Sequence, residues 1–330
     1  MKKYIAPIFI LIYTLCSIYF YIESKIKEDT IYFIYGYHKN LFGDDKKVFF
    51  NLANVIEEKG YKVIETNSFK NLKNAKKIVV FDIHKKKIRK IKKLSHNKLI
   101  LFTWEPPAVI KENHDKKYLS YFSKVYTFND DLIDNKKYFK FYYPDAKDMI
   151  ASNIDFKDKK FCTQIISNKT SDHISEIYTE RKKAIRFFEE HAIADFDLFG
   201  QGWNANEFIS YKGSIANKID VLKNYKFSIC FENSKNIKGY ITEKIFDCFH
   251  AKVIPIYLGA DNITDYIPKN CFIDKRDFKS YPELFIYLKT MSNEDYLTYI
   301  QNIKKFLNSE KAKAFTGKNL VETFIKALDI

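Results

Sequence analysis

Short apolar runs alternate along this chain with longer stretches in which apolar residues recur every three or four positions. The first pattern is typical of strands buried on both faces of a sheet, and the second of amphipathic helices. In the first half, strands are expected over residues 30–37, 61–66, 77–83, 98–104, 124–128 and 138–143. Helices are expected over residues 46–58 and 84–96.

A polar stretch of weak periodicity, residues 144–160, predicts a linker, after which the alternation resumes. Strands are then expected over residues 161–166, 196–199, 225–231 and 253–258, and helices over residues 173–191, 215–224, 240–250 and from 279 to the end. Strands joined by helical crossovers form parallel sheets covered on both faces, with ligands bound at the carboxyl ends of the strands. The sequence therefore predicts an α/β protein with two facing Rossmann-like domains, residues 25–150 and 151–330, and a cleft between them. The last helices are candidates to cross back to the first domain.

The N-terminus contains an uncharged run, residues 4–22. As a helix this run spans roughly 28 Å at about 1.5 Å per residue, close to the hydrocarbon thickness of a bilayer. The alternative is a cleaved signal peptide, but its apolar core is shorter and no small-residue cleavage site follows the run. We therefore expect a single membrane anchor helix over residues 1–24, with the membrane as a partner through residues 4–22.

The orientation of the expected anchor depends on flanking lysines. Lys2 and Lys3 favour a cytoplasmic N-terminus, whereas Lys25 and Lys27 favour the opposite orientation. The expected location is the Golgi membrane with a lumenal catalytic part in a eukaryote, and the cytoplasmic face of the inner membrane in a bacterium.

Composition narrows the possible functions. The chain is 46% apolar and 17% aromatic, so it can bury a substantial core and is not disordered. Its formal net charge of +15 attracts phosphates, but the lysines are spread along the whole chain, as on a solvated surface. The Lys-rich stretch over residues 84–96 has no interleaved aromatics, so nucleic acid is not expected as a partner.

The cysteines indicate neither a metal site nor a disulfide scaffold. Cys16 lies in the apolar N-terminal run, and the other four are widely spaced without a CxxC pair: Cys162, Cys230, Cys248 and Cys271. We expect these four to be small buried apolar residues.

The densest chemical signal spans residues 227–244, where a strand, a Gly-containing loop and a helix starting near Tyr240 follow one another. A helix N-terminus presents free N–H groups and partial positive charge, which suit a diphosphate. Lys244 adds a full charge, and Glu243 suits the hydroxyls of a sugar. The alternative is an ordinary helix start, in which Thr242 caps the helix and Glu243 complements its dipole.

This stretch resembles the donor-binding signature of the family 10 glycosyltransferases, the α1,3/α1,4-fucosyltransferases. The matching segments are Phe227…Phe231-Glu232-Asn233-Ser234, Tyr240-Ile241-Thr242-Glu243-Lys244 and Val253-Ile254-Pro255-Ile256-Tyr257-Leu258-Gly259. The resemblance implies that the two domains have the GT-B arrangement, with the acceptor bound by the first and GDP-fucose by the second. It assigns donor binding to Asn233, Tyr240, Glu243 and Lys244, with Glu232 and Thr242 in support.

The resemblance extends upstream to Arg181, which it assigns to the donor diphosphate. A guanidinium is well suited to neutralise charge on a leaving nucleoside diphosphate. Ser167-Asn168 and Asp197-Leu198-Phe199-Gly200 flank this arginine as in the family pattern, and Arg186 is a nearby competitor for the same role.

In the first half, Trp104-Glu105-Pro106-Pro107 is similar to the family's E-S-P segment, with Pro106 in place of serine. By that similarity Glu105 is the catalytic base that takes the proton of the acceptor hydroxyl. Asp82 and His84, also at a strand end, are alternative bases.

The family chemistry is a single displacement with inversion, from GDP-fucose to a glycan hydroxyl such as O3 of N-acetylglucosamine or a related sugar. Asp44-Asp45 and Asp130-Asp131 are interpreted as solvated loop pairs, so no cofactor and no metal are expected in the chemical step. Loop 234–238 is a candidate to set the details of donor recognition, so the same fold with another nucleotide-sugar is an alternative. A catalytically idle membrane protein that binds glycans or nucleotides is a second alternative.

Overall fold

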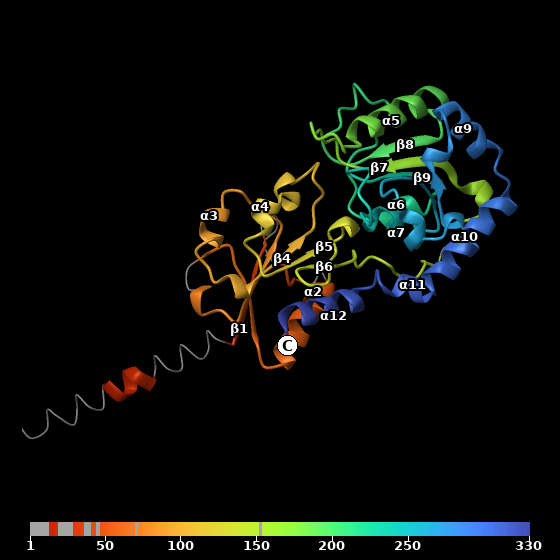
Figure 1. The fold of residues 1–330 in the computed structure, drawn as a ribbon. Helices are drawn as coiled ribbons and strands as arrows, with labels where there is room; N and C mark the ends of the chain where they lie inside the picture. Colours follow the sequence, from red (N-terminus) through yellow and green to blue (C-terminus); the bar gives the residue numbers. More distant parts are fainter. Residues whose placement is uncertain (1–12, 19–28, 36–40, 44–46, 70–71, 152–153) are drawn as a thin grey trace, which may run out of the picture.

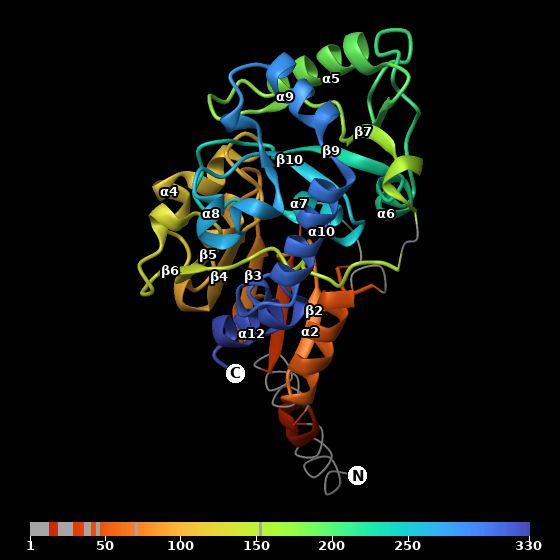
Figure 2. The same ribbon diagram turned by 90° about the vertical axis from the view of Figure 1, so that its right-hand side faces the viewer.

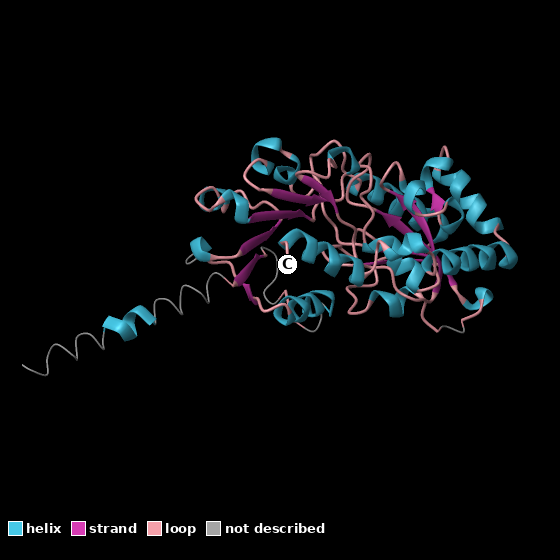
Figure 3. Ribbon diagram, turned by 60° about the horizontal axis from the view of Figure 1, so that its bottom comes forward, coloured by secondary structure: helices cyan, strands magenta, loops and turns pink. Residues whose placement is uncertain are grey.

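The computed structural model describes residues 13–18, 29–35, 41–43, 47–69, 72–151 and 154–330. The described residues form one sheet of six strands and one of five, which lie in two separate lobes (Figure 1). Helices flank the strands in each lobe (Figure 3). The predicted pair of parallel-sheet α/β domains is confirmed. The proposed boundaries at residues 24 and 150 stay predictions.

The first sheet has the strand order β2-β1-β3-β4-β5-β6, with every neighbouring pair parallel. Its strands are β1 (Thr30–Ile34), β2 (Lys62–Glu65), β3 (Lys77–Phe81), β4 (Leu99–Thr103), β5 (Lys124–Thr127) and β6 (Tyr138–Lys140). Its helices are α2 (Lys47–Glu58), α3 (Ile88–Ile91) and α4 (Lys116–Leu119). Buried side chains pack on both faces of the sheet, which explains why β3 and β4 are nearly continuous apolar runs.

The second sheet has the order β11-β10-β9-β7-β8, again parallel throughout. Its strands are β7 (Lys160–Ile165), β8 (Phe196–Phe199), β9 (Tyr225–Phe231), β10 (Ile254–Leu258) and β11 (Ile273–Asp274). The helices that belong to it are α5 (Tyr178–Ala192), α6 (Lys218–Leu222), α7 (Glu243–His250), α8 (Ile263–Tyr266), α9 (Tyr281–Thr290) and α10 (Asn293–Leu307).

The C-terminal segment crosses between the lobes. After α10, helices α11 (Glu310–Lys313) and α12 (Gly317–Leu328) run back to the first lobe, where α12 lies beside α2 (Figures 1 and 2). Phe324 of α12 is fully buried and stacks on Phe102 of β4 at 4.0 Å between ring centroids. The last helix therefore completes the core of the first lobe although it comes last in the chain.

Several expected helices differ from the observed ones. Residues 84–96 were expected to be one helix, but a single turn forms there, α3. Its N-terminal side carries Lys85, Lys86 and Lys87, whose charges oppose the helix dipole, and Lys87 provides no side-chain cap. The helix expected over residues 215–224 is shorter, α6.

The helix expected to start at residue 173 begins at Tyr178 instead. The preceding residues pair with the loop after β9: the Lys235 N–H donates to the Ser175 carbonyl, and the Ile177 N–H donates to the Asn233 carbonyl. These long-range bonds replace the helical ones, and they are invisible to local periodicity.

The expected membrane anchor lies mostly outside the described residues, which include residues 13–18 of it as a short helical piece. No helix among the described residues is long and apolar enough to cross a membrane.

Candidate functional site

A cleft of about 740 Å³ lies at the carboxyl ends of strands from both sheets. Its lining includes residues that follow β3, β4, β7, β8 and β9: Asp82, Trp104, Ile166, Gly200 and Asn233. Seven of the eight residues assigned by the sequence line it: Glu105, Arg181, Asn233, Tyr240, Thr242, Glu243 and Lys244. Glu232 does not, because its side chain is fully buried beneath the cleft wall.

Glu232 is the centre of a hydrogen-bond network at the start of α7. Its carboxylate accepts from the Thr242 N–H at 2.9 Å and from the Thr242 hydroxyl at 2.7 Å. The Lys244 ammonium lies 3.1 Å from it. Gly259 passes so close that a Cβ there would come within 2.6 Å of the Glu232 Cγ, so the turn after β10 requires glycine.

The alternative in which Thr242 caps the helix is wrong. Thr242 occupies the N-cap position of α7, but its side chain makes no capping hydrogen bond. Its hydroxyl instead donates to Glu232 and accepts from the Lys244 ammonium. The helix also begins three residues later than predicted, at Glu243. Tyr240 and Ile241 are instead buried in the loop before it.

Lys244 and Glu243 form a charged pair at the cleft wall, with the Lys244 Nζ 3.3 Å from the Glu243 carboxylate. Burial opposes the charge of Glu243, but Lys244 and Lys218 outweigh it and lower the pKa of Glu243 to about 2. Burial likewise opposes the charge of Lys244, but Glu232 and Glu243 raise its pKa above the usual value. Both groups are therefore charged at neutral pH.

Arg181 lies in the second turn of α5 and is 2% exposed. Its Nη2 donates to the Phe231 carbonyl at 2.6 Å and to the Asn233 side-chain oxygen at 3.0 Å, which ties α5 to the end of β9. Its buried Nε has no hydrogen-bond partner among the described residues. An unsatisfied buried donor costs about 1–3 kcal/mol, so an acceptor in the cleft beside Arg181 would be favoured.

Glu105 faces the cleft from the first lobe, on the loop after β4. Within the described part of the chain its carboxylate makes no hydrogen bond or ion pair, so it is available to a ligand. Burial raises the pKa of Glu105 above its ordinary value, and Lys169 and Lys244 partly offset this effect. Both lysines line the same cleft as Glu105.

Asp82 lies directly beneath this loop. Its Oδ1 accepts from the backbone N–H groups of Trp104 and Glu105, at 2.6 and 3.0 Å, and from the Asn113 amide at 2.5 Å. Burial raises the pKa of Asp82 to about 7, while the N–H donors from the loop lower it. The residue has a left-handed φ of 57°.

The sequence profile described as Glycosyltransferase family 10 (fucosyltransferase) C-term matches residues 155–323, just over half of the 330-residue chain. The chain belongs to glycosyltransferase family 10. The suspected membership is thus confirmed over the second lobe, which contains Arg181, Asn233, Tyr240, Glu243 and Lys244.

Two curated relatives of this family 10 chain illustrate the extent of the similarity. The alpha-(1,3)-fucosyltransferase FucT of Helicobacter pylori is 35% identical over 108 residues, which cover 32% of this chain and 22% of the relative. The 4-galactosyl-N-acetylglucosaminide 3-alpha-L-fucosyltransferase 9 of Mus musculus is 34% identical over 155 residues, 46% of this chain and 38% of the relative. The matched segments span well under half the length of these relatives.

Solved structures share the fold over nearly the whole chain. An alpha1,3-fucosyltransferase with GDP has a TM-score of 0.55 at 18% identity, covering 91% of this chain and 90% of that one. A glycosyltransferase from Rickettsia africae has a TM-score of 0.57 at 11% identity, covering 91% and 97%. At these identities the likeness concerns the fold, which is that of two-domain glycosyltransferases.

Two residues that the sequence offered as alternatives do not line the cleft: Arg186 for the diphosphate and His84 for the base. Arg186 points away from the cleft: it stacks on Phe208 at 3.9 Å and pairs with Glu189 and Glu207. It does not compete with Arg181. His84 is not among the residues that line the cleft, so it is a poor candidate base.

Of the two acidic pairs interpreted as solvated, Asp130 differs from that expectation, whereas Asp131 is exposed as expected. Asp130 is held by Lys140 at 2.6 Å, by Asn262 at 2.9 Å and by Tyr266 at 2.7 Å, and so it connects the first lobe to α8. Residues 44–46 lie outside the described part. No cluster of three or more potential metal ligands occurs among the residues that the structure describes. That the chemical step needs no metal stays a prediction.

Sequence reasoning did not select several other residues that line the cleft, among them Tyr35, Tyr143, Lys169 and Lys218. Lys218 pairs with Asp247 at 2.9 Å and lies 3.8 Å from Glu243, and the Tyr143 hydroxyl donates to the Trp104 carbonyl. Tyr143 ends an expected strand, which was a usable signal. The lysines gave none, because lysine is abundant throughout the chain.

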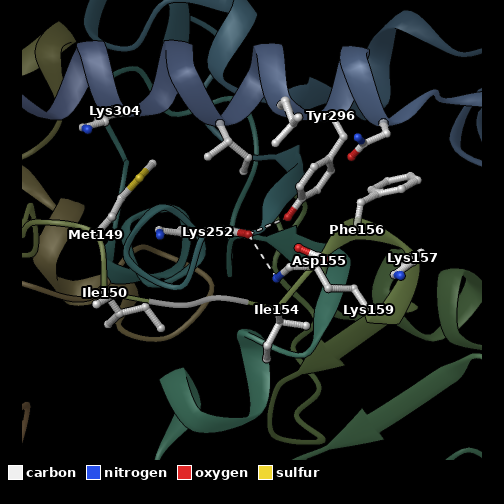
Figure 4. Close-up of a pocket in the computed structure, with 14 residues that line it drawn as sticks. Met149, Ile150, Ile154, Asp155, Phe156, Lys157, Lys159, Lys252, Tyr296 and Lys304 are labelled. Carbon is white, nitrogen blue, oxygen red and sulfur yellow. Dashed lines mark hydrogen bonds between the residues drawn. The ribbon is translucent and has the colours of Figure 1, made fainter.

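A second pocket, of about 940 Å³, lies outside the cleft, between the linker and α10 (Figure 4). Its buried Lys159 donates to the carbonyls of Lys223, Tyr225 and Lys252, and the Tyr296 hydroxyl also donates to the Lys252 carbonyl. Lys223 caps α6, and Lys252 follows the cap of α7. These polar groups therefore bind helix ends within the protein.

Proposed function

We propose that this chain is an inverting fucosyltransferase that moves fucose from GDP-fucose to a hydroxyl of a glycan acceptor. One observation carries the proposal: the cleft of this family 10 chain has two cations, Arg181 and Lys244, on the second lobe and faces them with a carboxylate of the first lobe, Glu105, to which no described residue is bonded. A displacement that needs one base and charge neutralisation on a leaving diphosphate requires this combination.

The donor is bound by the second lobe. The diphosphate lies against Arg181 and Lys244, whose charges stabilise the negative charge that develops on GDP as it leaves. The unsatisfied Nε of Arg181 and the charged state of Lys244 support this assignment. Glu243, ionised at neutral pH, accepts hydrogen bonds from sugar hydroxyls, while Asn233 and Tyr240 shape the wall. Glu232 and Thr242 hold Lys244 in place.

The acceptor hydroxyl reacts in front of Glu105. The hydroxyl oxygen bonds to C1 of fucose, its proton passes to the Glu105 carboxylate, and the bond from C1 to the diphosphate breaks, so that GDP leaves with the electron pair. The raised pKa of Glu105 makes it a stronger base than an exposed glutamate. The names of the relatives suggest O3 of N-acetylglucosamine or a related sugar as the acceptor position.

We also infer that residues 4–22 anchor the protein in a membrane, in the Golgi of a eukaryote or on the inner membrane of a bacterium. The uncharged length of the run supports this inference. Fractionation with and without carbonate wash tests it, and release of the full chain by the wash would contradict it.

The test of the function uses the purified full chain with a panel of nucleotide-sugars and a glycan acceptor. We expect transfer from GDP-fucose, and loss of about 10²–10⁴-fold in kcat for Glu105→Gln with unchanged GDP affinity. Turnover of another nucleotide-sugar would overturn the fucosyl assignment without affecting the assignment of the fold. Binding of GDP without any turnover would favour a catalytically idle protein.

A further inference from the structure

Asp82 occupies an unusual position at the end of β3. It is 1% exposed and lines the cleft, yet it is a carboxylate without a cation bonded to it in the described part of the chain. Its φ of 57° is in the left-handed region, which asparagine, aspartate and glycine tolerate better than other residues. Burying a carboxylate costs free energy unless hydrogen bonds compensate for the lost water. The hydrogen bonds of Asp82 therefore indicate its role.

Those hydrogen bonds converge on one residue of the next strand's loop. The Glu105 N–H donates to Asp82 at 3.0 Å, and the neighbouring Trp104 N–H donates to the same oxygen at 2.6 Å. Asn113, also bonded to Asp82, donates to the Glu105 carbonyl at 3.0 Å. His114 lies 3.3 Å from that carbonyl. The backbone of Glu105 is thus fixed at both its N–H and its carbonyl.

The side chain of Glu105 is in the opposite situation, since it makes no hydrogen bond with the described residues. A rigid backbone below a free carboxylate is what a base requires, because a misplacement of about 1 Å costs about 10²-fold in rate. To hold the backbone in this way, the loop needs an oxygen that accepts from its N–H groups, and the Oδ1 of Asp82 supplies it.

We propose that Asp82 is the positioning residue for Glu105: through its bonds to the Trp104 and Glu105 N–H groups it holds the catalytic carboxylate toward the acceptor hydroxyl. The inference rests on the proposed function and deepens it. It differs from the alternative in which Asp82 is itself the base: three donors already occupy its Oδ1, and the substitutions below separate the two roles.

Two substitutions at the same position separate positioning from proton transfer. Asp82→Asn keeps an oxygen acceptor and tolerates the left-handed backbone, but it cannot take a proton as a base. Asp82→Gly tolerates the same backbone and removes the acceptor. We expect Asp82→Asn to keep kcat within about 10-fold of the unchanged protein, and Asp82→Gly to lose about 10²-fold in kcat with the GDP-fucose dissociation constant unchanged.

The outcomes discriminate sharply when measured on the full chain. Asp82→Asn as inactive as Glu105→Gln would make Asp82 the base and overturn the proposal, and an Asp82→Gly variant with full kcat would overturn it as well. Equal losses of kcat and GDP-fucose binding in Asp82→Gly would indicate a general structural defect and also overturn it. Ile78→Val, a buried change in the same strand, controls for modest destabilisation. If the unchanged protein transfers no fucose, the proposed function itself has failed.

Discussion

Replacing Lys244 with methionine removes a charge but keeps most of the aliphatic chain. In the structure the Lys244 ammonium lies 3.1 Å from Glu232, whose side chain is 0% exposed. Among the described residues, the remaining hydrogen-bond partners of Glu232 are the N–H and hydroxyl of Thr242, which are neutral. The variant therefore leaves a fully buried carboxylate with two hydrogen bonds and no bonded cation.

The cost follows from this geometry. Removing one partner of a buried ion pair destabilises proteins by about 3–5 kcal/mol. Burial lowers the pKa of Arg181, and the nearby Glu232 carboxylate partly offsets this effect. The Arg181 charge therefore still stabilises Glu232 when the Lys244 charge is removed. We therefore expect a loss near the lower limit, about 3 kcal/mol in the free energy of unfolding.

Urea unfolding of a double-mutant cycle measures this loss. The variants are Lys244→Met, Glu232→Gln and the two combined, with Lys305→Met, exposed on α10, as the matched control. The double variant should recover at least about 1 kcal/mol relative to the sum of the single changes, because it leaves no unpaired buried charge. Single costs that add to within about 0.5 kcal/mol would refute the reasoning.

The same variants separate folding from donor binding. In the double variant the charge that we assign to the diphosphate is still missing, so GDP should bind about 1–3 kcal/mol more weakly, as for a lost charge-assisted contact. Calorimetry below the unfolding transition measures this. If the recovered fold binds GDP as tightly as the unchanged protein does, Lys244 supports the cleft wall without contacting the donor.

Three other predictions can be tested directly. If Glu105 is the ionised base that we propose, kcat/KM should fall as the pH drops through a midpoint above the ordinary value of 4.5, because burial raises the pKa of Glu105; a midpoint below 4.5 in the pH–rate profile would contradict this. Phe324→Ala should cost about 3–5 kcal/mol in thermal or urea unfolding, since this fully buried ring packs on Phe102 of the first lobe, and a loss under 1 kcal/mol would separate α12 from that core. Chelator treatment of the purified protein should leave kcat unchanged. Loss of activity that added metal restores would contradict the prediction that the chemical step needs no metal.

The alternation of strands and helices was readable from the sequence because parallel strands and amphipathic helices leave different periodicities. Local patterns failed where distant segments competed for the same backbone groups. Residues 173–177 pair with the loop after β9 instead of extending α5. The Lys-rich run after β3 forms one helical turn because its charges oppose a longer helix.

The sequence by itself also indicated the family and the candidate site residues, since the spacing of Glu232, Thr242, Glu243 and Lys244 is local and resembles a family signature. Tertiary structure decided which of these residues face the cleft and which are buried beneath it. Burial makes Glu232 a partner of Lys244 beneath the cleft, and hydrogen bonds across two strand ends join Asp82 to the Glu105 backbone, which is the basis of the role that we propose for Asp82. Contacts of this kind join residues far apart in the chain, so their energies depend on a fold that local sequence does not encode.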